Sequence, residues 1–293
     1  MIEDKIKELL KNKKCKPSFP IKNYKPVKKP EEQGLIVAAG NYIYALKGKE
    51  KYMVGLRPSY VIKLLYYDGS LYDASSNIIS NTLTDAIITR RKDWIKSFVF
   101  NNGKMYDATN EQIFETQSNK LIARRYSLIN LISHKGKLYD CGSYKEIFDT
   151  LKDEIITVRG GYSHLVSHND RLYDSSDNLV FETPSNKIIT KRSSSITNLF
   201  SQNGMLYDSC HNKLFDTFNN KIIAEKSSGI NCLLYNNNKL YASSDTYIFD
   251  TLGYPLSKEN LIGFNGDVHD MCNVPSSLLN KLISKGLPIT NYN

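Results

Sequence analysis

The chain has 293 residues, of which 41% are hydrophobic and 24% charged, and its formal net charge at pH 7 is +9. This composition is typical of a globular protein and excludes a disordered chain. The absence of a run of about 18 apolar residues excludes a membrane-spanning helix, and the charged start of the chain lacks the apolar core of a secretory signal. We therefore expect an unprocessed, cytoplasmic protein.

Residues 1–33 are expected to form a separate basic segment. They hold ten lysines and five acidic residues, so more than half of the net charge lies there. Apolar residues at 6, 9 and 10 predict a short helix, and four prolines after it predict an irregular linker. The segment could contact phosphates or be a solvated leader; the candidate contacts are Lys11, Lys13, Lys14, Lys16, Lys28 and Lys29.

From residue 34 onward one pattern recurs. A Leu-Tyr-Asp-like triplet is followed by an apolar-Phe-acid-Thr segment, as in LYDCGSYKEIFDT at 138–150. The central residue of the triplet falls at Tyr44, Tyr72, Tyr106, Tyr139, Tyr173, Tyr207 and Tyr241, with a degenerate eighth copy at His269. The successive gaps are 28, 34, 33, 34, 34, 34 and 28 residues. A period this regular predicts a repeat protein.

Each period contains four short apolar runs separated by Gly, Asn, Asp and Ser, which is typical of strands joined by tight turns. Neighbouring residues such as Leu138 and Tyr139 face opposite sides of a strand, yet both are apolar. A sheet buried on both faces explains this, and stacked blades bury both faces. The sequence therefore predicts an all-β fold, a seven-bladed β-propeller of four-stranded blades at residues 34–271.

The strand order resembles that of WD40 repeats over roughly residues 35–270. A first strand ends in a turn with Gly, and the third strand ends in apolar-Phe-acid-Thr where a WD40 repeat has Trp-Asp. The Trp-Asp dipeptide itself and the Gly-His before the first strand are absent. The resemblance therefore implies the propeller architecture and no particular activity.

The ends of the repeat region indicate how the ring closes. Residues 34–46 are expected to supply the first two strands of blade one, and a terminal hairpin near residues 260–271 to complete that blade, because a closed ring leaves no open sheet edge. An eight-bladed ring would leave one blade half-built. In residues 272–293, a Ser N-cap signal, Leu and Ile at helical spacing and a Gly stop predict a capping helix.

Two further columns of residues carry charge. One column holds Arg57, Arg91, Arg125, Arg159, Arg192 and Lys226, and the other holds Asp73, Asp107, Asp140, Asp174 and Asp208. Each Asp lies 15 or 16 residues after one cation and 18 or 19 before the next, so spacing leaves its partner open. We expect a structural ring of Arg–Asp pairs; the alternative is a row of cations that binds an anion.

The sequence shows no catalytic constellation. His134 and His168 occupy equivalent positions and are interpreted as surface turn residues, and the acids of the Phe-acid-Thr segments as turn-forming residues. The five cysteines form no paired motif, which predicts free thiols, and we expect no metal and no cofactor. Short connections leave a flat ring face, which does not favour an enzyme.

The favoured function is a protein-interaction scaffold. Trp94, Tyr126 and Tyr162 break the repeat just before first strands, beside Arg91, Arg125 and Arg159, and exposed aromatics beside arginine are typical of interfaces. The alternative is a nucleic-acid-associated factor, and a more distant one is a hydrolase or lyase at the channel mouth. That last possibility would require a cluster of unmatched polar residues. We expect a monomer with no membrane association.

Overall fold

The computed structural model describes residues 33–48, 50–142, 146–161, 163–225, 229–251 and 261–289. Residues 1–31 and 32–293 form two separate units, and the fold below is that of the second. The expected N-terminal helix, the linker and the lysines of the basic segment lie outside the described residues, as do Tyr162 and Lys226. No described helix is long and apolar enough to cross a membrane.

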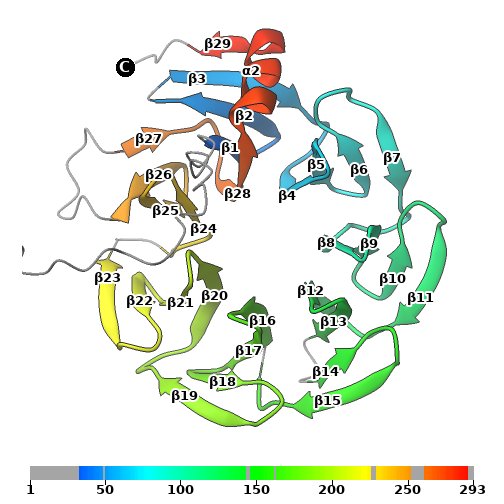
Figure 1. Ribbon diagram of the computed structural model, residues 1–293, viewed down its shortest axis with the longest axis vertical. Helices are drawn as coiled ribbons and strands as arrows, with labels where there is room; N and C mark the ends of the chain where they lie inside the picture. Colours follow the sequence, from blue (N-terminus) through cyan, green and yellow to red (C-terminus); the bar gives the residue numbers. More distant parts are fainter. Residues whose placement is uncertain are drawn as a thin grey trace, which may run out of the picture. The chain divides into compact units, whose positions relative to one another are not determined.

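Seven antiparallel sheets surround a central channel (Figure 1), which confirms the seven-bladed propeller. From the innermost to the outermost strand, blades two to four are β4 Val61–Tyr67, β5 Ser70–Ser75, β6 Ile78–Asn81 and β7 Ile87–Arg90; β8 Ser97–Asn101, β9 Lys104–Ala108, β10 Gln112–Glu115 and β11 Lys120–Arg124; and β12 Leu128–His134, β13 Lys137–Gly142, β14 Glu146–Asp149 and β15 Glu154–Val158.

Blades five to seven follow the same order. They are β16 Ser163–His168, β17 Arg171–Ser176, β18 Leu179–Glu182 and β19 Lys187–Lys191; β20 Ile196–Gln202, β21 Met205–Cys210, β22 Lys213–Asp216 and β23 Lys221–Glu225; and β24 Leu233–Asn236, β25 Lys239–Ser244, β26 Tyr247–Asp250 and β27 Leu261–Gly263.

The turn between the first and second strand of each of blades two to seven has two residues, both with positive φ, as at Asn102-Gly103 (50° and 77°). A two-residue hairpin with both central residues in this region is a type I′ turn, whose twist matches that of the strands. These positions are filled by Asp-Gly, Asn-Gly, Lys-Gly, Asn-Asp and Asn-Asn. The turns therefore explain why polar residues and glycine separate the apolar runs of the sequence.

The core lies between neighbouring blades. Leu138 is fully buried against Tyr106 and Leu131, and Tyr139, its neighbour on β13, packs instead with Leu165 and Leu172 of the next blade. Each second strand therefore buries one face against the preceding blade and the other against the following one, as the paired apolar residues predicted.

Blade one closes the ring, but its strands differ from those predicted. β28 (Val268–Pro275) is the innermost strand, followed by β1 (Gln33–Ala39), β2 (Tyr42–Lys47) and β3 (Glu50–Leu56). β27 is the outer strand of blade seven, so the expected terminal hairpin in blade one was wrong. Apolar runs of similar length do not distinguish a second strand from a third, and only the pairing of the two ends does so.

The register also reassigns two residues of the Tyr column. Val37 on β1 pairs with Met271 and Tyr44, in the way that Asp140 pairs with Leu131 and Phe148. Tyr44 therefore matches the Phe of the Phe-acid-Thr segment, and His269 belongs to an innermost strand.

The C-terminal segment packs on blade one, as Figure 1 shows. The expected helix is α2 (Ser276–Lys285), although Pro275 occupies its N-cap position without a side-chain hydrogen bond. A Cβ on Gly34 would lie 2.7 Å from Leu279, so glycine permits the close approach of α2 to β1. β29 (Leu287–Ile289) then pairs with β3 as a fifth strand, so the sheet extends beyond residue 271.

Candidate functional site

The arginine column inserts between blades. Each arginine follows the fourth strand of one blade and pairs with the aspartate of the next. Arg91 donates from Nε to Asp107 Oδ2 and from Nη2 to Oδ1, both at 2.6 Å. The same two-point pairing joins Arg57 to Asp73, Arg159 to Asp174 and Arg192 to Asp208, whereas Arg125 reaches Asp140 through Nε at 2.8 Å.

Three more groups of the receiving blade, an aromatic ring, a threonine and a turn residue, complete most of the arginine sockets. The Arg57 socket has Ser80 in place of the Phe, and in the Arg159 socket Thr183 Oγ1 has no hydrogen-bond partner among the described residues. The Phe of the Phe-acid-Thr segment stacks under the guanidinium, as Phe114 does 4.2 Å below Arg91. The Thr donates to the aspartate, as Thr116 Oγ1 does to Asp107 at 2.7 Å. An Asp or Asn with positive φ in the turn to the fourth strand accepts from Nη1, as Asn119 does from Arg91.

The sockets explain both sequence columns. The side chains of Arg57, Arg91, Arg125, Arg159 and Arg192 are between 3 and 9% exposed, and the Asp side chains at most 1%. The guanidinium groups are therefore held inside the ring rather than presented to an anion. The stacked Phe and the turn Asn or Asp were missed in the sequence, although SNK, NNK and KDE recur at the turn.

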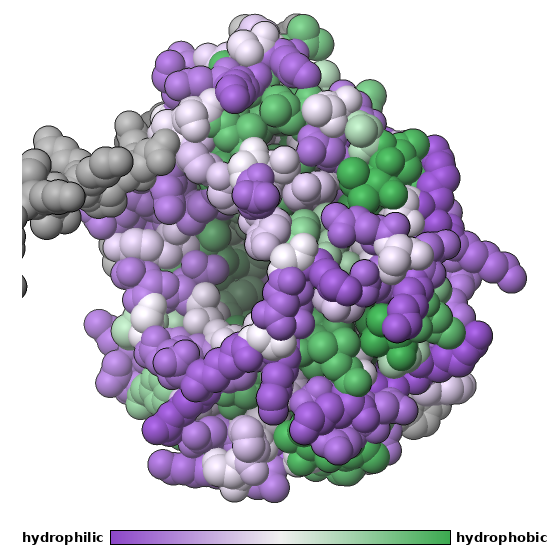
Figure 2. Space-filling model, turned by 45° about the vertical axis from the view of Figure 1, so that its right-hand side comes forward, coloured by the Kyte–Doolittle hydropathy of each residue, from purple (hydrophilic) through white to green (hydrophobic). Residues whose placement is uncertain are grey.

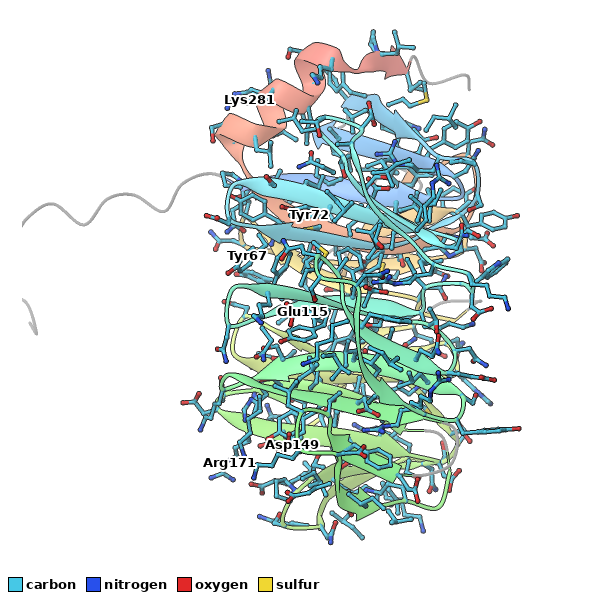
Figure 3. All side chains as sticks on the ribbon, turned by 90° about the vertical axis from the view of Figure 1, so that its right-hand side faces the viewer. Tyr67, Tyr72, Glu115, Asp149, Arg171 and Lys281 are labelled. Carbon is cyan, nitrogen blue, oxygen red and sulfur yellow. The ribbon has the colours of Figure 1, made fainter. Side chains whose placement is uncertain are left out.

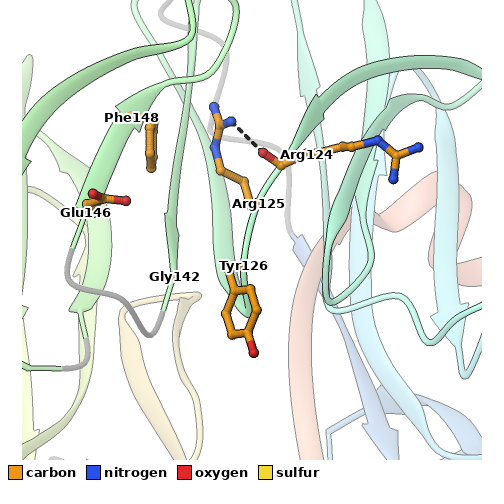
Figure 4. Close-up of a pocket in the computed structure, with 6 residues that line it drawn as sticks. All are labelled: Arg124, Arg125, Tyr126, Gly142, Glu146 and Phe148. Atoms are coloured by element: carbon orange, nitrogen blue, oxygen red, sulfur yellow. Dashed lines mark hydrogen bonds between the residues drawn. The ribbon is translucent and has the colours of Figure 1, made fainter.

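The socket of Arg125 is less complete. Among the described residues its Nη2 has no hydrogen-bond partner. Its Nη1 donates to Asp153, whose side chain is 72% exposed, and to the Arg124 carbonyl at 2.8 Å (Figure 4). Burial raises the pKa of Asp140, and Arg125 opposes that rise. A pocket of about 320 Å³ opens beside it, lined by Tyr126, Gly142, Glu146 and Phe148.

The connections between blades carry exposed aromatic side chains. We call this end of the ring the connection face, because each fourth strand passes there to the next first strand. Trp94 is 63% exposed and Tyr126 67% exposed, and Tyr60, which the sequence reasoning missed, is 61% exposed. All three lie two to four residues after the end of a fourth strand, on successive connections into blades two, three and four.

The opposite end of the ring, the hairpin face, holds the turns between first and second strands. Tyr67 and Arg171 both lie at the left edge of the side view in Figure 3. Here the acids of the Phe-acid-Thr segments pair with the cation that precedes the Leu-Tyr-Asp triplet, as Glu115 does with Lys104 at 3.0 Å. Asp216 faces no such cation, because Met205 stands there; it accepts from the turn amides of Phe218 and Asn219.

His134 and His168 are strand residues at the hairpin face, not exposed turn residues. His168 is 3% exposed, and its Nδ1 lies 3.0 Å from Ser201 Oγ of blade six. His134 Nδ1 lies 2.7 Å from Ser167 Oγ of blade five. Each is the last residue of its first strand rather than a turn residue, and these imidazoles bridge neighbouring blades.

The central channel holds a cluster of polar residues that the repeat does not explain. The hollow at the centre of the ring is visible in Figure 2, and the innermost strands enclose a cavity of about 520 Å³. Lys63 on β4 and Asp270 on β28 form an ion pair there, with 3.6 Å between Nζ and Oδ2. The sequence reasoning missed this cluster, because β28 had been assigned to a different strand position.

The described cysteines are free thiols: Cys141, Cys210 and Cys232 are buried and Cys272 is partly buried. Burial raises the pKa of Cys232 and Cys272, which line the channel, to about 12. Both are therefore protonated at neutral pH, and a thiol rather than a thiolate faces the cavity.

Comparisons with known proteins identify the fold alone. No protein-family profile and no curated protein matches the chain. Among solved structures it is similar to the computationally designed Ika8 protein (TM-score 0.52, 9% identity, 83% of this chain and 88% of that one). It is also similar to BamB from Moraxella catarrhalis (TM-score 0.50, 13% identity, 71% and 80%).

A third similar structure is the extracellular domain of a putative one-component system from B. thetaiotaomicron (TM-score 0.54, 12% identity). The match covers 73% of this chain but only 39% of that one. Because this neighbour is extracellular, the cytoplasmic location stays a prediction. At these identities a shared fold does not transfer a function. What the three likenesses show is that the chain has the β-propeller fold.

Proposed function

We propose that the chain is a non-catalytic interaction module that binds a protein partner through its connection face. The observation that carries this proposal is the row of exposed aromatic side chains, Tyr60, Trp94 and Tyr126, on three successive connections. Large aromatic residues that protrude from a rigid scaffold are typical anchors of protein interfaces. The arginine sockets supply the rigidity, because each ties one connection to the next blade.

The charge around these aromatics favours an acidic partner surface. Lys92 and Lys96 are exposed on the connection that carries Trp94, with one exposed acid, Asp93, and Arg90 and Arg124 are exposed at the ends of the preceding strands. Such a field raises the association rate with an acidic surface and weakens as salt increases. The same exposed cations also favour the second candidate, a nucleic acid, since phosphates would be attracted in the same way.

The proposal is tested by affinity capture from a native lysate, with and without nuclease. We expect a defined set of proteins that survives nuclease treatment and that the double variant Trp94→Ala/Tyr126→Ala loses by about tenfold or more, as when a binding hot spot is removed. Phe218→Ala is the matched control, because Phe218 is 49% exposed on the hairpin face. Partners that disappear with nuclease would instead support the nucleic-acid candidate.

A further inference from the structure

At one position of the innermost strands the residue type differs between most blades, whereas the position after it is apolar in every blade. The residue that pairs with the Asp column, or with Ala242 and Val37 at the same position of blades seven and one, is apolar and buried in all seven blades: Leu64, Phe98, Leu131, Leu165, Leu199, Leu233 and Met271. The residue just before it is polar or a thiol and differs between most blades: Lys63, Ser97, Asn130, His164, Asn198, Cys232 and Asp270. We call these seven residues the channel ring.

The channel ring is not required by the repeat. A position that serves blade packing takes the same residue type in each blade, as the apolar neighbour and the arginine sockets do. All seven ring residues line the same cavity of about 520 Å³. The Lys63 side chain is 40% exposed, although it belongs to an innermost strand, because the strand borders the channel.

In their hydrogen bonds to the protein, the side chains of the channel ring act mainly as donors. Asn130 Nδ2 donates to the Leu165 carbonyl and Asn198 Nδ2 to the Ile230 carbonyl, both at 3.0 Å. Ser97 Oγ donates to the Leu131 carbonyl at 3.3 Å. Within the part of the chain that the structure describes, these bonds consume N–H and O–H groups only, so the amide oxygens of both asparagines and the lone pairs of the serine remain as acceptors.

The charges of the ring balance. Asp270 Oδ2 accepts from the Leu64 N–H at 2.8 Å and faces Lys63 Nζ, so its Oδ1 is a further acceptor. Lys63 keeps N–H groups beyond the one directed at Asp270, since an ammonium has three. A ligand with net charge would be repelled by the member of this pair that has the same charge, whereas a neutral ligand would not.

We propose that the channel ring binds a small, uncharged polyol, of the size of a monosaccharide or a cyclic polyol. Hydroxyl groups both donate and accept, so they match a wall with several spare carbonyl-type acceptors and one ammonium donor. The cavity lies within the range of small-molecule sites. This site does not involve the connection face, so its test is independent of the test for the proposed protein partner.

The test uses the full chain and D-glucose, D-galactose and myo-inositol as probes, with sodium acetate and inorganic phosphate as anions. Saturation-transfer NMR detects binding, and titration calorimetry measures it. We expect at least one polyol to bind saturably with a Kd of roughly 1 mM or tighter. Lys63→Gln and Asn198→Leu should each weaken it by about tenfold, the worth of one hydrogen bond to a charged or buried group.

Arg171→Gln is the matched control, because this exposed cation lies at the hairpin face away from the channel, and its affinity should equal that of the unaltered protein. If a channel variant does not fold, amide chemical-shift changes in the unaltered protein decide instead. Changes along β4, β20 and β28 support the site. The proposal is overturned if no polyol saturates, if only the anions bind, or if the shifts map outside the innermost strands.

Discussion

At the scale of single residues, the two repeated motifs together form the site that binds one arginine side chain. The Leu-Tyr-Asp triplet supplies the carboxylate that takes two guanidinium N–H groups, and the Phe-acid-Thr segment supplies the stacked ring and the hydroxyl that orients the carboxylate. A planar guanidinium suits this site because it can be bidentate and stacked at once. A lysine would satisfy only part of it.

Removing one carboxylate should destabilise the ring strongly. Asp107→Ala would leave the Arg91 guanidinium buried without a counter-charge, so we expect the free energy of unfolding to fall by about 3–5 kcal/mol. Urea unfolding monitored by tyrosine circular dichroism and the fluorescence of Trp94, the single tryptophan, measures this. The double variant Arg91→Met/Asp107→Leu should recover part of the loss, because it removes both charges.

The control for this prediction is an acidic residue of an arginine socket that lies at the surface. Asp85 pairs with Arg57 at 2.9 Å, but its side chain is 68% exposed. Asp85→Asn keeps an acceptor at a position with positive φ, as Asn119 does in another blade, so the cost should stay below about 1 kcal/mol. Equal losses from Asp107→Ala and Asp85→Asn would contradict the importance assigned to the buried pair.

At the scale of the elements, the innermost strands are joined to their neighbours by side chains as well as by packing. His168 illustrates this bridge: its Nε2 lies 3.0 Å from Asn169 Nδ2, which can only donate, so Nδ1 carries the proton and donates to Ser201 Oγ. Its ring also contacts Tyr173 and Phe218. The neutral imidazole therefore fits the site, and a second proton would face the donor of Asn169.

This arrangement predicts a loss of stability on mild acidification. Burial lowers the pKa of both His134 and His168 below the usual 6.5. The unfolded chain then binds more protons than the folded one, so the stability is present above about pH 6.5 and is lost as the pH falls through the lowered values. Urea unfolding at pH 7.5 and 5.5 should show the decrease, and His134→Gln/His168→Gln should reduce its slope. An unchanged slope in the double variant would exclude these residues as its source.

At the scale of the whole molecule, one strand from the C-terminal end joins the two ends of the propeller. β28 pairs with β1 over seven residue positions and buries Val268, Met271 and Val274 against blades one, two and seven. α2 covers the same blade with Leu278, Leu279 and Leu282. Without β28, blade one would lack its innermost strand, and the apolar groups of blades two and seven that pack against β28 would be exposed.

Two truncations separate the roles of these parts. Removal of residues 276–293 should keep the ring but lower its stability, because it removes the three buried leucines of α2, whose burial is worth roughly 1.5–3 kcal/mol each, and exposes the apolar surface of blade one beneath them. Removal of residues 268–293 also takes β28 and should abolish cooperative unfolding. Circular dichroism during urea titration, with size-exclusion chromatography for compactness, checks both. A cooperative transition in the shorter chain would show that the closing strand is dispensable.

The sequence by itself determined the architecture. The strands, the two-residue turns and the seven-fold period are set by neighbouring residues, whose propensities and turn chemistry are local. The charge columns could be identified in the same way, because identical side chains recur at fixed spacing.

Only the tertiary structure decided which blade receives each arginine, which strand closes the ring and which residues meet in the channel. Spacing along the chain placed Asp107 16 residues after Arg91 and 18 before Arg125, which did not identify its partner, and blade geometry selected Arg91. Lys63 and Asp270 are 207 positions apart, so no local pattern could join them; β28 must first complete blade one. The repeat encodes each blade, whereas the channel ring forms only when the seven blades close.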